Sequence, residues 1–304
     1  MNNNKKLDPM IEGYLSYLLE VSRKAPRTVI DVRCTLGRLA EAMEKLRPGV
    51  PPWKLPLESY LQWLEQLRSG KASASCLCKY ISHVRGLLEY AWRSGRADRN
   101  VLDGFHLQDN QERRVPEALS IEEARRLVEA CPKGTAADRR DRIMVLLLYG
   151  CGLRTNELCQ LQVEDVDRDR KEVFVRKGKG DRQRVVPIPE GVMPELLAYL
   201  LDRGGKRGPL LRTAVKARRI DAHDTCEVVS QAARRAGIEW NVTPKTLRHS
   251  YATHLMDRGV DLAVISSLMG HRSPAETGVY LHVLKDRPQQ AVERLNQRQE
   301  GSQS

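Results

Sequence analysis

Apolar residues recur every three or four positions through the first third of the chain. Residues 29–46, 57–67 and 77–91 each carry such a set, and this spacing places the apolar side chains on one face of an α-helix. A further helix is expected over residues 9–22. The pattern predicts a bundle of four helices within residues 1–100, a common size for a domain.

The periodicity stops at residues 101–116, where polar and charged residues dominate and apolar residues are isolated. We interpret this stretch as an interdomain linker. Helical structure restarts at Ser120, which is predicted to form a capping box with Glu123. The second domain is expected over residues 117–298, and the polar residues 299–304 are expected to form a disordered tail.

The pattern of the second domain is mostly helical, with one β feature. Residues 172–176 and 182–188 are strand-like, and the glycine-flanked Lys179 lies in the turn between them. This hairpin places Lys179 at its tip. The predicted fold class is mainly α: a four-helix domain followed by a mixed α/β, mostly helical domain with a small sheet.

Composition limits the classes of partner. The chain has 51 lysines and arginines against 39 acidic residues, a net charge of +12; a nucleic-acid partner and a merely soluble basic protein fit this charge equally well. The longest apolar run, residues 143–149, is too short to cross a membrane, and no signal peptide is visible. We therefore expect a cytoplasmic protein without a membrane partner. The seven cysteines lack paired zinc spacing and are expected to be reduced thiols.

Two segments bring basic residues to places where an anion could bind. Arg154 follows the glycines that end an apolar helix, so its guanidinium and the free N–H groups of the next helix would lie together. A surface salt bridge is the alternative interpretation of Arg154. Lys179 could swing from its hairpin tip into a neighbouring site or remain solvated, and its segment lacks the spacing of a phosphate-binding P-loop.

Two further segments lie in the last quarter of the chain. Lys245 and Arg248 are three residues apart in a predicted helix, so they share a face. Gly270 is predicted to end another helix, with His271 in the connection that follows. Tyr280 lies two turns into the next predicted helix. Taken alone, Tyr280 would be interpreted as half-buried packing.

In chain order, these segments supply an arginine, a lysine, a basic residue three positions before a second arginine, a histidine and a tyrosine. That order resembles the catalytic set of the tyrosine recombinase (phage integrase) family. The flanking residues also match, in the segments GLRTNEL, KGKGDRQRVVPIP, TPKTLRHSYATHL and LMGHRSPAETGVYLHV. The resemblance covers residues 115–283 and is most similar to the bacterial Xer and integron-integrase branch. Less specifically, the N-terminal bundle resembles the family's SAM-like core-binding domain, which binds DNA.

The resemblance implies a role for each residue at the phosphate. Arg154 and Arg248 would clamp the scissile phosphate, and His271 would form a hydrogen bond with it. Tyr280 would be the nucleophile. Tyrosine has a free pKa of ~10, so it needs a strongly positive environment to attack as a phenolate.

The resemblance also implies the source of the proton for the leaving 5′-oxygen. Lys179 would be the general acid, with the nearby Lys177 as a rival for that role. Lys245 stands where the family usually has histidine, and we keep it as a catalytic residue. Glu157 matches an acidic family position that steadies the site.

The implied activity is site-specific DNA recombination, in which strands are cleaved and rejoined through a 3′-phosphotyrosyl intermediate to integrate, excise or resolve DNA. The phosphotyrosine keeps the energy of the broken bond, so no ATP is needed. No acidic metal cluster is visible in the sequence, and no metal or cofactor is expected. The implied assembly is a homotetramer on two double-stranded DNA sites, with a related recombinase or an accessory protein as the alternative partner. Six basic residues are expected to meet DNA phosphates: Arg182, Arg184, Arg212, Lys216, Arg218 and Arg219.

Two other functions fit parts of the pattern. A type IB topoisomerase would share the chemistry without exchanging strands, but the short helical N-terminal domain and the Xer-like pattern argue against it. A non-catalytic DNA-binding protein on the same scaffold would have lost the tyrosine or an arginine, and the chain retains Tyr280, Arg154 and Arg248.

Overall fold

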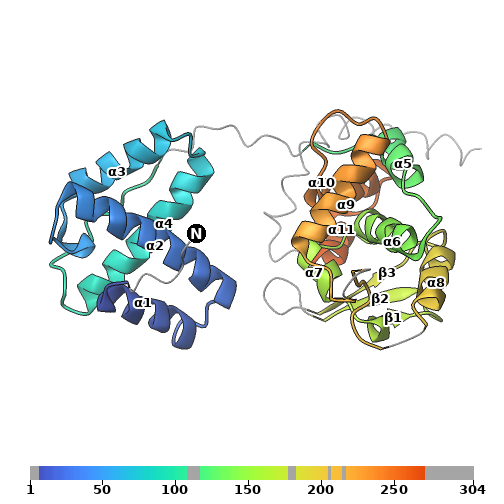
Figure 1. The fold of residues 1–304 in the computed structure, drawn as a ribbon, viewed down its shortest axis with the longest axis horizontal. Helices are drawn as coiled ribbons and strands as arrows, with labels where there is room; N and C mark the ends of the chain where they lie inside the picture. Colours follow the sequence, from blue (N-terminus) through green and yellow to red (C-terminus); the bar gives the residue numbers. More distant parts are fainter. Residues whose placement is uncertain (1–6, 108–116, 177–182, 205–206, 214–216, 271–304) are drawn as a thin grey trace, which may run out of the picture. The chain divides into compact units, whose positions relative to one another are not determined.

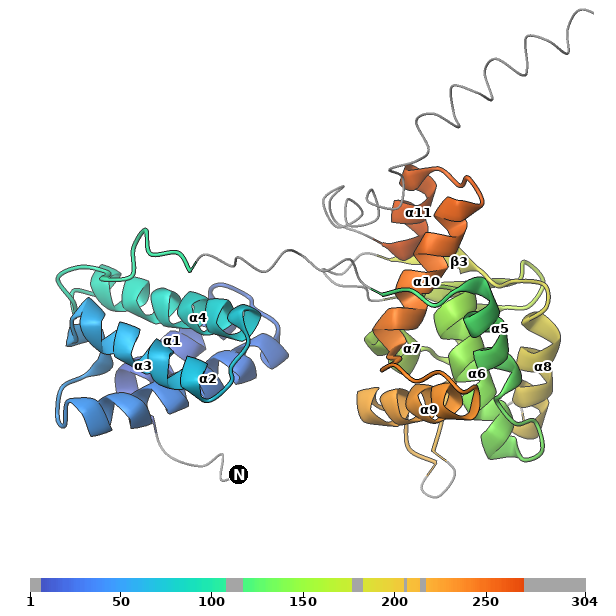
Figure 2. The same cartoon turned by 90° about the horizontal axis from the view of Figure 1, so that it is seen from above.

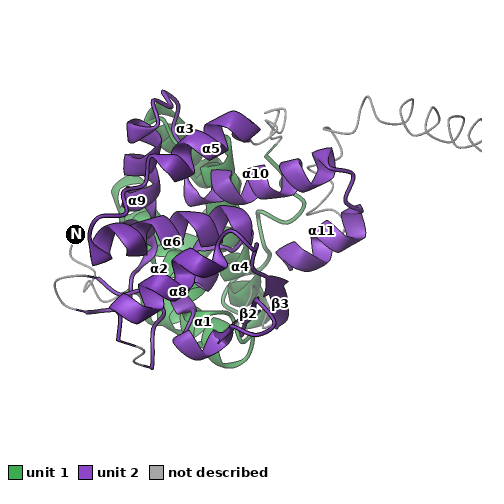
Figure 3. Cartoon of the chain, turned by 90° about the vertical axis from the view of Figure 1, so that its right-hand side faces the viewer, with its two compact units in different colours: residues 1–114 green, residues 115–304 purple. Residues whose placement is uncertain are grey.

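The chain divides into two compact units, residues 1–114 and residues 115–304 (Figure 3). Three of the expected catalytic residues, Lys179, His271 and Tyr280, lie outside the part of the chain that the structure describes. The computed structural model describes residues 7–107, 117–176, 183–204, 207–213 and 217–270.

Unit 1 is the expected four-helix bundle (Figure 1). Apolar side chains on the facing sides of its helices are fully buried, among them Leu36 and Leu39 of α2 and Val84 and Leu87 of α4. Burying a side chain of this size stabilises the fold by about 1.5–3 kcal/mol relative to leaving it exposed. The helices are α1 (Pro9–Glu20), α2 (Pro26–Leu46), α3 (Leu57–Ser69) and α4 (Ala74–Arg93), with a short 3-10 turn at Pro52–Lys54.

The chain after α4 folds back onto unit 1. Leu102 is buried in the bundle core. Arg85 of α4 donates hydrogen bonds to the carbonyl oxygens of Leu102, at 3.1 Å, and Phe105. The first part of the stretch expected as a linker therefore packs against α4, because it carries an apolar residue and two carbonyl groups that Arg85 can reach.

Unit 2 is built around α6 (Figures 1 and 2). The second half of α6 is apolar on every side, which is typical of a helix surrounded by others, and residues 143–148 are all buried. Helices α5, α7, α8, α9 and α10 all pack against it. The helices of this unit are α5 (Ile121–Glu129), α6 (Ala136–Gly150), α7 (Thr155–Gln160), α8 (Met193–Asp202), α9 (Ala222–Arg235), α10 (Pro244–Asp257) and α11 (Leu262–Met269).

A three-stranded antiparallel sheet adjoins these helices, in the order β1 (Val166–Asp167), β2 (Glu172–Val175) and β3 (Arg184–Pro187). The two longer strands confirm the predicted hairpin, whereas the two-residue β1 was not predicted. Val186 of β3 is buried. Because side chains alternate along a strand, Arg184 lies on the same face of the sheet as Val186.

The cysteines and the apolar helices were the subject of two further sequence predictions. All seven cysteines are free thiols, three of them buried. Within the described residues, the structure contains no helix long and apolar enough to span a membrane.

Candidate active site

A tight turn between α6 and α7 places Arg154. Gly152 in this turn has φ +58°, a left-handed conformation that favours glycine. A Cβ atom at Gly152 would lie 2.4 Å from the ring of Tyr251, so the close approach of α10 also requires glycine here. Arg154 is the N-cap residue of α7, as its position after the glycines predicted.

Glu157, one turn further along α7, holds Arg154 at two points. The backbone N–H of Arg154 donates to Oε2 of Glu157 at 2.9 Å, and Nη1 of Arg154 donates to Oε1 at 2.9 Å. The Glu157 side chain is only 2 % exposed. A buried carboxylate therefore determines the orientation of the Arg154 guanidinium.

Two more arginines reach the same carboxylate. Arg184 of β3 forms a fork with it, donating from Nη1 to Oε1 at 2.9 Å and from Nη2 to Oε2 at 2.7 Å. Arg248 of α10 brings its Nη1 to 3.9 Å from Oε2. Among the described residues, three guanidinium groups thus surround one carboxylate. We call Arg154, Glu157, Arg184 and Arg248 the arginine cluster.

The carboxylate of the arginine cluster is ionised. Burial raises the pKa of Glu157, but the hydrogen bonds and charge of Arg184, together with the hydrogen bonds from Arg154, outweigh burial and lower this pKa to about 2. Glu157 is therefore ionised at neutral pH, and three positive charges face one negative charge. Guanidinium groups that are already held in place can donate forked hydrogen bonds to an oxyanion, so the cluster is suited to bind an anion.

The same three arginines hold the C-terminal end of α11. Arg184 Nε donates to the carbonyl of Leu268 at 2.7 Å, Arg248 Nη2 to that of Met269 at 2.6 Å, and Arg154 Nη2 to that of Gly270 at 3.0 Å. The last carbonyls of a helix lack partners within the helix and attract cations. Gly270 adopts the left-handed conformation that ends α11, as predicted.

Helix α10, which carries Arg248, is anchored at several points. Arg248 Nη1 donates to the carbonyl of Gly152 at 2.6 Å. Ser250 Oγ accepts from the backbone N–H of Leu119 at 2.8 Å, and His254 Nε2 donates to the carbonyl of Leu119 at 2.8 Å. The buried His254 is thus a hydrogen-bonded core residue. These contacts fix α10, and with it Arg248, against the start of unit 2.

Lys245 and Arg248 have different surroundings although they are three residues apart. Arg248 is buried, whereas Lys245 is exposed on the first turn of α10. The structure therefore brings together two of the expected catalytic residues, Arg154 and Arg248, and places Lys245 on the neighbouring surface.

Arg184, which the sequence places among the phosphate-contacting residues, pairs with protein groups in the structure. Its side chain is only 9 % exposed, and its guanidinium donates to Glu157 and to the end of α11. The alternation along β3 contained the signal, because Arg184 is two residues from the buried Val186. Of the other basic residues in that set, Arg218 forms ion pairs with Asp221 and Asp224 and is 47 % exposed, and Arg182 and Lys216 lie outside the described residues.

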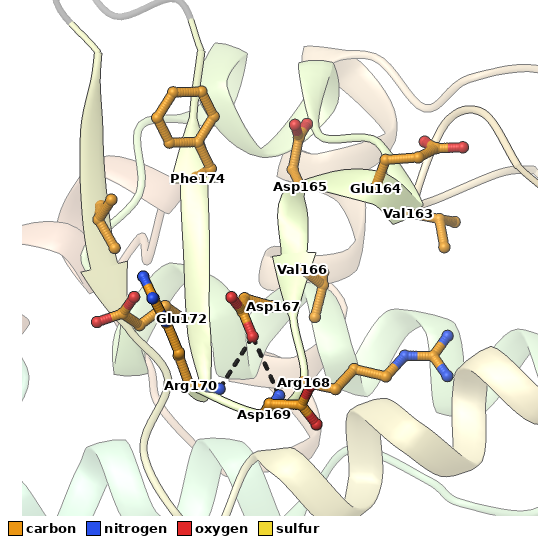
Figure 4. A pocket seen from close by; sticks show the side chains of 11 residues that line it. Val163, Glu164, Asp165, Val166, Asp167, Arg168, Asp169, Arg170, Glu172 and Phe174 are labelled. Atoms are coloured by element: carbon orange, nitrogen blue, oxygen red, sulfur yellow. Dashed lines mark hydrogen bonds between the residues drawn. The ribbon is translucent and has the colours of Figure 1, made fainter.

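A concave region lies beside the sheet, and its charge is opposite in sign to that of the three arginines (Figure 4). Five of its lining residues are acidic and two are arginines. Within it, one oxygen of Asp167 accepts from the backbone N–H groups of Asp169, at 3.1 Å, and Arg170, at 2.9 Å, which closes the β1–β2 turn. This surface repels a phosphate, and the described residues contain no group of three side chains able to hold a metal ion.

Comparisons with known proteins identify the family. Residues 117–287 match the model of the phage integrase family. The chain is 37 % identical over 290 residues to the tyrosine recombinase XerA of Thermococcus kodakarensis, covering 94 % of each chain. It is 31 % identical over 303 residues to the tyrosine recombinase XerD of Mycobacterium tuberculosis, covering 93 % of this chain and 96 % of the relative.

A solved structure has the same fold. The integrase of transposon Tn1549, in complex with transposon right-end DNA, superposes with a TM-score of 0.74 over 94 % of this chain and 99 % of the integrase, at 18 % identity. The family match spans more than half of the chain, and the relatives match along nearly all of it. The chain therefore belongs to the phage integrase family of tyrosine-type site-specific DNA recombinases.

Proposed function

We propose that the arginine cluster binds the scissile phosphate of a DNA recombination site, and that Tyr280 attacks this phosphate to form a 3′-phosphotyrosyl bond. The observation that carries the proposal is the convergence of three guanidinium groups on one buried carboxylate, that of Glu157. A phosphodiester is an anion that forked guanidinium donors bind well. Arg154 and Arg248 are the two arginines that the family pattern assigns to the phosphate.

The chemistry benefits from guanidinium groups that are already fixed in place. In phosphoryl transfer, negative charge accumulates on the non-bridging oxygens in the transition state. Donors held by Glu157 and by backbone carbonyls need no reorganisation when that charge develops. A forked guanidinium can donate two parallel hydrogen bonds to phosphate oxygens, which adds geometric control.

The proposed reaction exchanges one phosphate ester for another. The Tyr280 oxygen forms a bond to phosphorus while the bond from phosphorus to the 5′-oxygen breaks. Lys179 donates a proton to that leaving oxygen, with Lys177 as the rival donor. Lys245 and His271 add positive charge and hydrogen bonds around the phosphate. Attack by a 5′-hydroxyl of another strand then reverses the step, and no external energy source is needed.

We further propose that unit 1 is the core-binding domain, and that the chain acts in the cytoplasm as a homotetramer on two double-stranded DNA sites. A related recombinase or an accessory protein is the alternative partner. The relatives named tyrosine recombinase and the integrase solved with transposon DNA support the DNA partner. The net charge of +12 is consistent with it.

Covalent trapping tests this function on whichever DNA site the chain uses in the cell. Cells expressing the chain would be lysed under denaturing conditions, and DNA that remains attached to the protein would be recovered and sequenced. We expect enrichment of one short, inverted-repeat-like site. Recovery of no attached DNA, or of DNA without a shared sequence, would contradict site-specific recombination.

A further inference from the structure

Arg184 stands at the junction of three elements that carry or adjoin the site. It projects from β3, forks to Glu157 of α7, and donates from Nε to the carbonyl of Leu268 at the end of α11. These three hydrogen bonds engage all three nitrogen atoms of its guanidinium. With its side chain 9 % exposed, Arg184 is committed to protein groups.

Glu157 connects Arg184 to Arg154. Oε1 of Glu157 accepts from Nη1 of both arginines, at 2.9 Å each. Oε2 accepts from the backbone N–H of Arg154 and from Nη2 of Arg184. A single-point contact would let the carboxylate rotate, whereas the fork from Arg184 fixes its plane. The direction of the Arg154 guanidinium therefore depends on Arg184.

The end of α11 depends on Arg184 as well. Gly270 follows directly after the carbonyls that the arginines hold, and a Cβ atom there would lie 2.9 Å from Nη1 of Arg184. His271 is the next residue in the sequence. Arg184 thus packs against the point from which the chain continues to the proposed catalytic histidine.

We propose that Arg184 is a positioning residue for strand cleavage: it orients Arg154 through Glu157 and holds the end of α11, without contacting DNA. This inference rests on the proposed function. Its consequence is a specific division of effects. Loss of the Arg184 geometry slows the chemical step at saturation, while the affinity for DNA changes little.

Arg184→Lys separates geometry from charge. Lysine keeps the positive charge beside Glu157. Its compact ammonium group cannot donate two parallel hydrogen bonds to the carboxylate and a third to the carbonyl of Leu268 at the same time. Lysine also retains a cation at this position, which alanine would not, so the variant is expected to fold.

The chain offers a matched control in Arg142 of α6. Arg142 forks to Glu195 of α8, with Nη2 to Oε1 at 2.9 Å and Nε to Oε2, and it also donates to the carbonyl of Val128 near the end of α5. Its side chain is 8 % exposed. Arg142→Lys therefore removes the same kind of fork and the same kind of helix-end contact in elements that carry none of the expected site residues.

The experiment measures single-turnover cleavage of a nicked duplex that carries the site recovered by covalent trapping. The rate constant at saturating protein, the half-saturating concentration and the melting temperature are measured for each variant. We expect Arg184→Lys to lower the rate constant ~100-fold, as misplacement of catalytic groups does, with a half-saturating concentration within about threefold of wild type. Arg142→Lys should lower the melting temperature comparably and leave the rate constant within about twofold.

A second arm tests the route through Glu157. Glu157→Gln alone should slow cleavage strongly. Introduced together with Arg184→Lys, it should slow cleavage little beyond the effect of Arg184→Lys alone, because the two residues act as one unit. Independent, multiplying effects would overturn the proposal.

Three other outcomes would also overturn it. They are a wild-type rate for Arg184→Lys, equal slowing by Arg142→Lys, and a loss confined to the half-saturating concentration, which would indicate a direct DNA contact. If the wild-type chain itself forms no covalent adduct on the recovered site, the recombinase function fails and the positioning role fails with it. If the wild-type chain cleaves the site and Arg184→Lys cleaves it at the same rate, the positioning role is overturned and the recombinase function stands.

Discussion

Two buried arginine forks in unit 2 are built from the same parts. Arg142 pairs with Glu195 and donates a hydrogen bond to a carbonyl near the end of α5. Arg184 pairs with Glu157 and donates a hydrogen bond to a carbonyl near the end of α11. They differ in what surrounds the carboxylate. The Glu195 side chain is 28 % exposed and has one further cation nearby, the solvent-exposed Lys133. Glu157 is 2 % exposed and faces two further arginines.

This difference separates a structural fork from a functional one. Buried ion pairs contribute little net stability, because desolvation offsets their attraction. A balanced pair such as Arg142–Glu195 orients helices, and nothing more is required to explain it. Around Glu157, two further arginines converge on the same carboxylate. The proposed phosphate gives this convergence a function.

The largest predicted effect separates charge neutralisation from proton donation. Lys179→Ala should slow cleavage of normal DNA by roughly two to four orders of magnitude, the usual contribution of a general acid. A substrate with sulfur at the bridging 5′ position has a leaving group that needs no proton. On that substrate Lys179→Ala should cleave nearly as fast as wild type, and Arg154→Ala should stay slow.

Lys177→Ala is the internal control for this experiment and should behave almost normally on both substrates. Rescue of Lys245→Ala by sulfur, in place of Lys179→Ala, would move the acid to the first turn of α10. Rescue of neither variant would indicate that the proton comes from another source.

The second prediction concerns a cation that lies beside the carboxylate of each fork without belonging to the fork. Arg154→Ala should reduce the cleavage rate by ~10²–10³, the typical loss when one preorganised donor to a transition state is removed. Lys133→Ala, which removes the extra cation beside Glu195, should leave the rate unchanged. Single-turnover cleavage measures both. Equal effects of the two substitutions on the cleavage rate would show that Arg154 contributes no more to cleavage than a cation remote from the site.

The third prediction concerns acid stability. The pKa of Glu157 is lowered from 4.5 to about 2 on folding, so its stabilisation is complete above the unfolded pKa and is lost as the pH falls toward 2. A shift of that size corresponds to about 3 kcal/mol of unfolding free energy. Denaturant unfolding should show that Glu157→Gln loses most of this pH dependence.

Glu195→Gln is the comparison for acid stability. Arg142 also lowers the pKa of Glu195, but the partial exposure of Glu195 allows water to screen the pair. Its substitution should therefore remove a smaller part of the pH dependence. A larger effect from Glu195→Gln would reverse the ranking of the two forks.

The smallest predicted effect comes from the end of α11. Gly270 and Gly237 both have positive φ, +61° and +69°, but only Gly270 has a neighbour close to where a Cβ atom would lie, the Arg184 guanidinium. Alanine at either position should cost ~1–2 kcal/mol of backbone strain. Gly270→Ala should cost more, by displacing Arg184, and should also slow cleavage. Equal losses of unfolding free energy, with normal cleavage, would contradict this contact.

Local patterns in the sequence predicted much of the fold. The four helices of unit 1 and the β2–β3 hairpin follow from apolar periodicity, which depends only on neighbouring residues. The positions of Arg154 and Gly270 follow from helix-ending glycines. The two-residue β1 was missed because so short a strand leaves no alternation to detect.

Contacts between distant segments were not predictable in this way. Arg184 and Leu268 are 84 positions apart, and no local pattern joins β3 to the end of α11. For the same reason the sequence placed Arg184 among the phosphate-contacting residues. Lys245 and Arg248 share a spacing but not an environment, since only the tertiary packing of α10 determines which residue is covered.

The most direct test of the central claim is to identify the residue that becomes attached to DNA. The trapped adduct would be digested with protease and nuclease, and the peptide that retains a nucleotide would be sequenced by mass spectrometry. Tyr251 provides a matched control, because it packs against Gly152 beside the cluster and burial raises its pKa to about 12. We predict that the nucleotide is on the peptide containing Tyr280, that Tyr280→Phe binds the site without forming an adduct, and that Tyr251→Phe still forms one. A nucleotide on any other residue, or an adduct that survives Tyr280→Phe, would contradict the assignment.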